Sequence, residues 1–107
     1  MTAPLIYTPA HPRIDASNAG VAENDIQQLF AQSASGSLLI DLSGVGYLSS
    51  AGLRVLLIAA KTAKLRGGKV AIASPQPSVK DIIVMSGFDK LIAICSDRAA
   101  GLASLQA

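Results

Sequence analysis

Aromatic side chains are scarce in this sequence, which has no tryptophan and only two tyrosines and two phenylalanines among 107 residues. A hydrophobic core must therefore be aliphatic. Half of the residues are hydrophobic and only 15% are charged, a composition that excludes disorder over the whole length. The length suffices for one compact domain, so we expect a single domain over residues 1–107.

Cysteine and histidine are each present once, as Cys95 and His11. One cysteine cannot form an internal disulfide, and because Cys95 ends an apolar run we expect it to be a buried small hydrophobe. One histidine between prolines, without clustered acids or thiols, provides neither a metal-ligand spacing nor a catalytic triad. We therefore expect a protein that is not an enzyme and that uses no metal and no cofactor.

Long apolar runs are also missing. The richest run follows Arg54 and ends before Lys61, well short of the roughly 18 residues that a membrane span needs. The N-terminus lacks a basic segment followed by an apolar stretch, so no secretory signal is visible. These features, with the lone cysteine, favour a cytoplasmic protein without a membrane partner.

Acidic charge is sparse in the second half of the chain. Residues 1–53 carry one base and four acids, whereas residues 54–90 carry seven bases and two acids, for a net charge of +2. A nucleic-acid surface is usually denser in arginine and carries stacking aromatics. We therefore expect ordinary solvated charge and no direct nucleic-acid partner.

Strand and helix signals alternate along the chain. Short apolar runs predict strands at 5–7, 38–42, 69–73 and 91–95. Helical spacing predicts helices over about 19–32, from Ser49 or Ser50 to Arg66, over 79–86 and over 97–105. Prolines at positions 4, 9 and 12 restrict the first strand to a short or edge position, and Gly67 and Gly68 suit the left-handed end of the long helix. This alternation predicts an α/β layer structure.

Two adjacent hydroxyls, Ser49 and Ser50, lie where a small-residue loop meets the long helix. Taken alone, the residues allow one serine to cap the helix and the other to be a bystander, or one of them to be a modifiable hydroxyl presented on a loop. Gly52 in the first helical turn costs about 0.5–1 kcal/mol relative to alanine, which suggests that another backbone or a partner comes close there. If Gly52 serves such an approach, we expect Gly52→Ala to leave the melting temperature equal or slightly higher and to weaken partner binding.

Residues 41–57 resemble the signature of bacterial STAS-domain anti-sigma factor antagonists. Further similarities lie upstream at Arg13-Ile14-Asp15-Ala16 and, in order downstream, at Gly67-Gly68, Ser78-Val79-Lys80 and the run from Met85 to Leu91. The resemblance is strongest over residues 13–96, and residues 1–12 form a short proline-rich segment. It implies an α/β fold, namely a single STAS-like domain with a small mixed β-sheet and helices packed mainly on one face.

The resemblance also implies a function. Family members bind an anti-sigma factor that is also a serine kinase, phosphorylation of a loop serine abolishes the complex, and a PP2C-type phosphatase restores it. In the family pattern Asp-Ser-Ser-Gly-Leu the modified serine stands two positions before the glycine, which corresponds to Ser50. Ser49 occupies the acidic position of that pattern, so Ser49 remains the alternative acceptor.

By the same resemblance, the surface that binds the partner comprises Ser49, Ser50, Gly52, Arg54, Ile58 and Lys61. The last three fall at i, i+4 and i+7 and form one helix stripe, although Ile58 is equally compatible with a core position. We expect Leu53, Leu56, Leu57 and Ala60 to face the sheet. Two other functions remain open: an accessory STAS subunit of a transporter ATPase in lipid or solute export, and a small-ligand or nucleotide-binding STAS domain.

Overall fold

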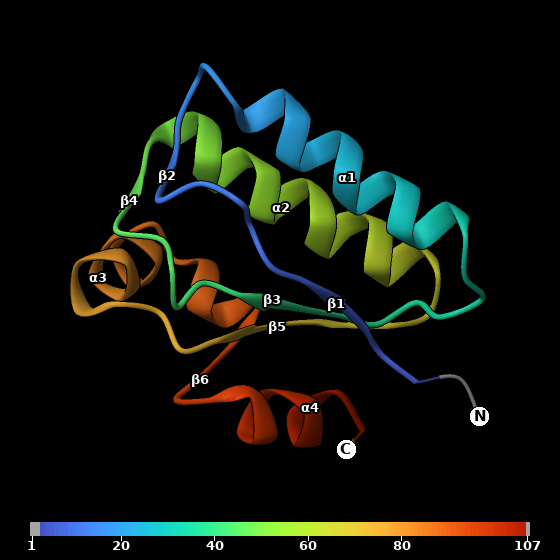
Figure 1. The fold of residues 1–107 in the computed structure, drawn as a ribbon. Coiled ribbons are helices and arrows are strands. Elements are labelled where there is room, and N and C mark those ends of the chain that lie inside the picture. Colours follow the sequence, from blue (N-terminus) through green and yellow to red (C-terminus); the bar gives the residue numbers. More distant parts are fainter. Residues whose placement is uncertain (1–2, 107) are drawn as a thin grey trace.

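A four-stranded sheet is the central layer of the computed structural model, which describes residues 3–106 (Figure 1). The strand order is β1-β3-β5-β6, with bounds Leu5–Tyr7, Leu38–Asp41, Val70–Ala73 and Ala93–Cys95. A separate two-stranded ladder pairs β2 (Arg13–Ile14) with β4 (Tyr47–Leu48). Each of these neighbouring pairs is parallel.

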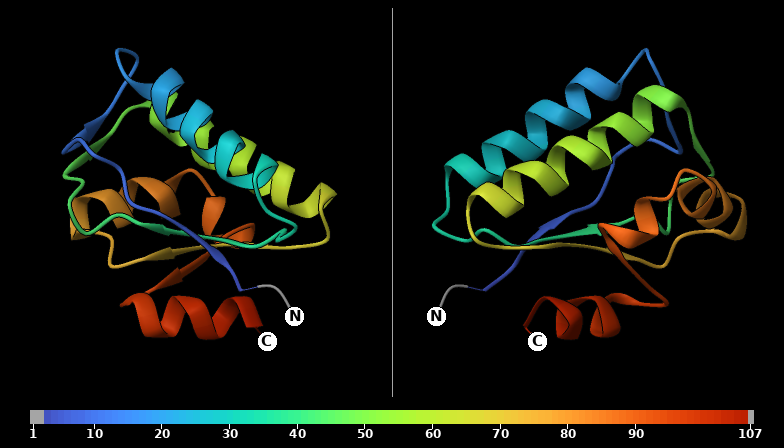
Figure 2. Two further views of the ribbon diagram at one scale, coloured as in Figure 1. Left: turned by 45° about the vertical axis from the view of Figure 1, so that its right-hand side comes forward. Right: turned by 180° about the vertical axis from the view of Figure 1, so that it is seen from behind.

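Helices cover both faces of the sheet (Figures 1 and 2). On one face, α1 (Ala19–Ala31) and α2 (Ser50–Leu65) lie side by side, and α3 (Pro77–Met85) contributes to the same core. On the opposite face, α4 (Arg98–Gln106) packs against β3, β5 and β6. A single 3-10 turn, η1 (Phe88–Lys90), leads from α3 towards β6.

Successive residues of the central strands enter two different cores, because side chains alternate across a strand. Leu38 and Ile40 of β3 pack with the helices α1–α3, whereas Leu39 packs with Leu105 of α4. All four residues of β3 and of β5 are buried, which explains why both strands are continuous short runs without polar alternation.

Arg66, the C-cap of α2, connects the C-terminal ends of α1 and α2. Its guanidinium donates hydrogen bonds to the carbonyl of Phe30 in the last turn of α1, at 2.7 Å, and to the carbonyl of Ser33 just after that helix. Gly67 follows with φ of +77°, the left-handed conformation expected after this helix. The two helices are thereby held at the end remote from Ser50.

The expected fold class, a single α/β STAS-like domain with helices mainly on one face, is confirmed. One detail was wrong, because the strand pairings of residues 3–106 are all parallel and the sheet is not mixed. Helical crossovers return each strand of the main sheet in the same direction. The two-residue strands β2 and β4 were not predicted, since they are too short to show a periodic pattern. Within residues 3–106, no helix is both long and apolar enough to cross a membrane.

Candidate functional site

The loop between β3 and α2 is anchored by aliphatic side chains at regular intervals. Leu42, Val45 and Leu48 are buried in the main core, while the intervening Ser43, Gly44, Gly46 and Tyr47 are exposed. These three anchors hold the loop against the protein surface and fix the point at which the first turn of α2 begins.

The N-terminal segment holds this loop from the side. The backbone N–H of Gly46 donates to the carbonyl of Pro12 at 2.8 Å, and that of Ser49 donates to the carbonyl of Ile14 at 3.0 Å. On the outside of the same ladder, the guanidinium of Arg13 lies 4.3 Å from the centroid of the Tyr47 ring, a cation–π contact. The position of the helix start thus depends on residues more than thirty positions upstream.

The two serines have different structural roles. Ser49 is the N-cap of α2, and its Oγ accepts a hydrogen bond from the backbone N–H of Gly52 at 3.3 Å. Ser50 is the first helical residue and is exposed. The hydroxyl of Ser49 is thereby engaged within the fold, and that of Ser50 is presented to solvent beside the amides that begin the helix.

Gly52 is buried where α2 touches β2. A Cβ at this position would lie 2.7 Å from the carbonyl oxygen of Ile14 and 3.2 Å from Cδ2 of Leu48. The close approach expected at Gly52 is therefore made by a backbone of the same chain, and the expectation of an equal or higher melting temperature for Gly52→Ala has to be reversed.

The stripe on α2 begins one turn after Ser50. Arg54 and Lys61 are exposed, and Ile58 is half-buried without belonging to the side chains packed on the main core. No acidic residue lies in the first turn of α2. Ser50, Arg54 and Lys61 thus give this part of the surface a hydroxyl and two cations.

The start of the loop is fixed by Asp41, the last residue of β3. Its carboxylate accepts a hydrogen bond from the backbone N–H of Ser43 at 2.9 Å and forms an ion pair with Arg98 at 2.7 Å, and Arg98 also donates to Thr8 Oγ1 at 3.1 Å. Burial by itself would raise the pKa of Asp41, but the hydrogen bonds from Ser43 and Arg98 outweigh it and hold the pKa below its ordinary value. Asp41 therefore joins the loop to α4 and to the N-terminal segment.

Comparison with protein families decides the identity of this domain. A family model described as the STAS domain matches residues 2–101. The chain belongs to the STAS domain family. BtrV of Bordetella bronchiseptica, a candidate anti-sigma factor antagonist, is 32% identical to this STAS domain over 91 residues, which cover 83% of the chain and 78% of BtrV.

Solved structures agree with the family assignment at the level of the fold. A candidate anti-sigma factor antagonist from Thermotoga maritima superposes with a TM-score of 0.83 at 17% identity, covering 95% of this STAS domain and 88% of that chain. The anti-sigma factor antagonist SpoIIAA in its unphosphorylated form superposes with a TM-score of 0.76 at 15% identity, covering 92% and 86%. The protein is therefore a STAS domain similar to anti-sigma factor antagonists, which are regulatory binding proteins.

The STAS domain brings together most of the residues singled out from the sequence. Ser49, Ser50 and Gly52 share the first turn of α2, and Arg54, Ile58 and Lys61 continue along it. Sequence reasoning missed the support from Pro12–Ile14 and the ion pair of Asp41 with Arg98. The first has no periodic signal, and the second joins residues 57 positions apart.

The inward face of α2 is wider than expected. Of the four residues expected to face the sheet, Leu56 is buried and Leu53 and Ala60 are partly buried against the core, but Leu57 is only half-buried, lies outside the core and lines a surface groove instead. Val55 and Ala59, which were not expected on this face, are buried as well. The reason is that α1 packs against α2 and covers a second side of it.

Proposed function

We propose that this STAS domain is a phosphorylation-controlled binding module that antagonises an anti-sigma factor of the serine-kinase type. In this scheme Ser50 accepts the phosphoryl group from the kinase, and a PP2C-type phosphatase removes it. The division of roles between the two hydroxyls carries the proposal: Ser49 caps α2, whereas Ser50 is exposed beside it. Modification of Ser50 leaves the cap of α2 in place, whereas modification of Ser49 would alter the oxygen that accepts the hydrogen bond from the Gly52 amide.

The resemblance to anti-sigma factor antagonists supports the choice of partner. The partner surface comprises the first turn of α2 and the stripe formed by Arg54, Ile58 and Lys61. Ile58 supplies the apolar contact, and the two cations flank it on the same side of the helix. Buried Gly52 contributes by allowing the first turn to sit against β2 and so sets the position of Ser50.

The switch follows from the position of Ser50. Phosphoryl transfer forms a bond between Ser50 Oγ and the γ-phosphorus of ATP, ADP leaves, and the hydroxyl proton is released. The product adds about −1.5 to −2 charges at the start of a helix, where unpaired amides and the helix dipole favour an anion by about 0.3–1 kcal/mol. The modified helix is therefore stable, and the partner is released because charge and bulk are placed where it packed.

Phosphorylation of single-serine variants tests the proposal directly. Wild type, Ser49→Ala and Ser50→Ala are each incubated with ATP and a purified anti-sigma factor kinase of the host, and phosphopeptides are located by mass spectrometry. We expect modification of the wild type and of Ser49→Ala, and none of Ser50→Ala. Loss of the Ser49 cap should lower the free energy of unfolding by about 0.5–2 kcal/mol without moving the site.

Two results would contradict this assignment. Modification of Ser50→Ala together with its loss in Ser49→Ala would transfer the acceptor to Ser49. Equal affinity of the kinase for wild type and for the phosphorylated protein would remove the switch, even if Ser50 is the modified residue.

A further inference from the structure

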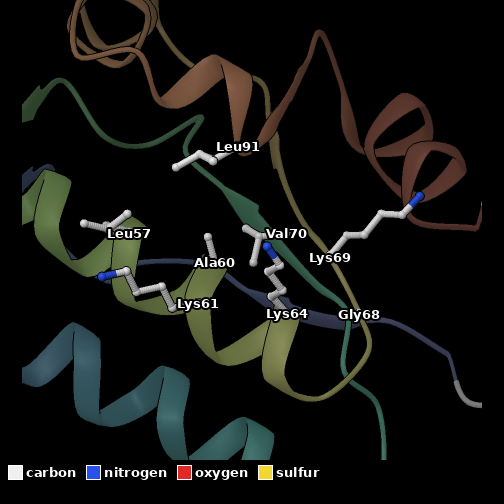
Figure 3. A pocket seen from close by; sticks show the side chains of 8 residues that line it. All are labelled: Leu57, Ala60, Lys61, Lys64, Gly68, Lys69, Val70 and Leu91. Atoms are coloured by element: carbon white, nitrogen blue, oxygen red, sulfur yellow. The ribbon is translucent and has the colours of Figure 1, made fainter.

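A groove of about 330 Å³ lies beside the second half of α2, away from Ser50 (Figure 3). Its apolar surface comes from three parts of the chain: Leu57 and Ala60 of α2, Val70 at the start of β5, and Leu91 after η1. Leu91 is 62% exposed, an unusual position for a large aliphatic side chain. The groove therefore offers water-exposed aliphatic surface that the fold itself leaves uncovered.

The groove is positively charged. Lys61 and Lys64 lie one helical turn apart on α2 and line it, whereas the side chain of Lys69, at its end, points away from these two lysines (Figure 3). Of the eight lining residues none is acidic. The ion pairs recorded within residues 3–106 are those of Arg13 and Arg98, so neither Lys61 nor Lys64 is neutralised by a carboxylate there.

These features identify the chemistry of an occupant. Aliphatic walls suit an alkyl chain, and ammonium groups at the rim suit an anion. None of the lining residues is aromatic, so a nucleotide base has no surface on which to stack. The groove also runs along the C-terminal half of α2, where no free amides point outward to hold a phosphate.

We propose that this groove binds a carboxylate carried on an unbranched alkyl chain, with the chain against Leu57, Val70 and Leu91 and the carboxylate at Lys64. The proposal is independent of phosphorylation at Ser50. Lys61 also belongs to the partner surface proposed above, so Lys64 is the lysine that tests the groove alone.

Decanoate is the probe, titrated into ¹⁵N-labelled protein below its critical micelle concentration and followed by amide chemical shifts. We expect saturable shifts centred on Ala60, Gly68, Val70 and Leu91. Because an exposed pair of opposite charges contributes modestly, Lys64→Gln should weaken binding about two- to five-fold. Decanol, which has the same chain without the charge, should bind wild type and Lys64→Gln equally. Leu91→Asp, at an exposed position that the fold tolerates, should abolish decanoate binding.

Matched variants separate the groove from general effects of charge and hydrophobicity. Leu65→Asp changes a side chain that is 89% exposed on the same helix but does not line the groove, and Lys80→Gln removes a lysine from α3. Both should bind decanoate like the wild type.

Three outcomes would overturn the proposal. Shifts that do not saturate, or that Leu65→Asp reduces as much as Leu91→Asp, would mean nonspecific adsorption. Equal affinity of wild type and Lys64→Gln for decanoate would mean that the lysine stems only shield apolar surface. Self-association abolished by Leu91→Asp, or groove shifts caused by an acidic peptide but not by decanoate, would assign the groove to a protein.

Discussion

Replacing Gly52 by alanine tests whether contact between α2 and β2 holds the loop that presents Ser50. The added Cβ would lie 2.7 Å from the carbonyl oxygen of Ile14, a distance that forces the backbone of β2 or of the helix start to move. That same oxygen accepts the hydrogen bond from the Ser49 amide. Gly20, in the first turn of α1, is the matched control, since a Cβ there would meet nothing within 4 Å.

The expected magnitude follows from three contributions. Helix propensity favours alanine by about 0.5–1 kcal/mol. Relieving the overlap costs about 1–3 kcal/mol, and weakening the hydrogen bond at Ile14 costs about 1 kcal/mol more. The sum predicts that Gly52→Ala lowers the free energy of unfolding by about 1–3.5 kcal/mol, whereas Gly20→Ala raises it by up to about 1 kcal/mol.

Urea denaturation followed by circular dichroism measures both values, and amide hydrogen exchange at Ser49 locates the effect. Exchange at Ser49 should accelerate in Gly52→Ala and stay unchanged in Gly20→Ala. If Gly52→Ala is as stable as the wild type and protects Ser49 equally well, the contact with Ile14 does not constrain this loop and our account of its support is wrong.

Three further measurements address the other features of the molecule. Because the pKa of Asp41 is lowered, the ionised carboxylate stabilises the fold above about pH 4, and this stabilisation is lost as the pH falls through the lowered pKa. Arg98→Ala should lower the free energy of unfolding by about 1–2 kcal/mol at neutral pH and should make that free energy, measured by urea denaturation, less dependent on acid pH. An unchanged pH dependence would show that the hydrogen bond from the Ser43 amide alone lowers the pKa of Asp41. Ser50→Asp should keep the wild-type amide spectrum and an equal or higher melting temperature while binding the kinase more weakly, and widespread shift changes would indicate refolding instead. Cys95, half-buried rather than fully buried as expected from the sequence, should react with a thiol reagent more slowly in the folded protein than in urea but measurably, and identical rates would mean full exposure.

The order of helices and strands was predictable because most elements carry strong local signals. The long helix from Ser50 to Leu65 has a capping serine and a terminal glycine, and the buried strands are short aliphatic runs. The segments β2 and β4 were not predictable, since two residues carry no periodicity and their pairing depends on tertiary contact. Likewise, the sequence indicated that something approaches Gly52 but could not distinguish a partner from the backbone of Ile14.

The assignment of the helix cap to Ser49 and not to Ser50 illustrates the same limit. Sequence resemblance favoured Ser50 but left Ser49 open, because either hydroxyl can cap a helix. The cap was assigned only when backbone geometry placed Ser49 outside the helix with its Oγ towards the Gly52 amide.

The dependence of the Ser50 loop on the N-terminal segment means that the structural unit around Ser50 is discontinuous in the chain. A truncated protein that starts after Ile14 would still contain the whole motif from Asp41 to Leu53, yet it would lack the carbonyl acceptors for the amides of Gly46 and Ser49. A graft of residues 41–53 onto another scaffold would therefore need a short parallel segment beside it. For the same reason, affinity tags and fusions are better joined ahead of β1 than inserted between Tyr7 and Pro12. An insertion there would disturb the pairing of β2 with β4, which supports the start of α2 at Ser50.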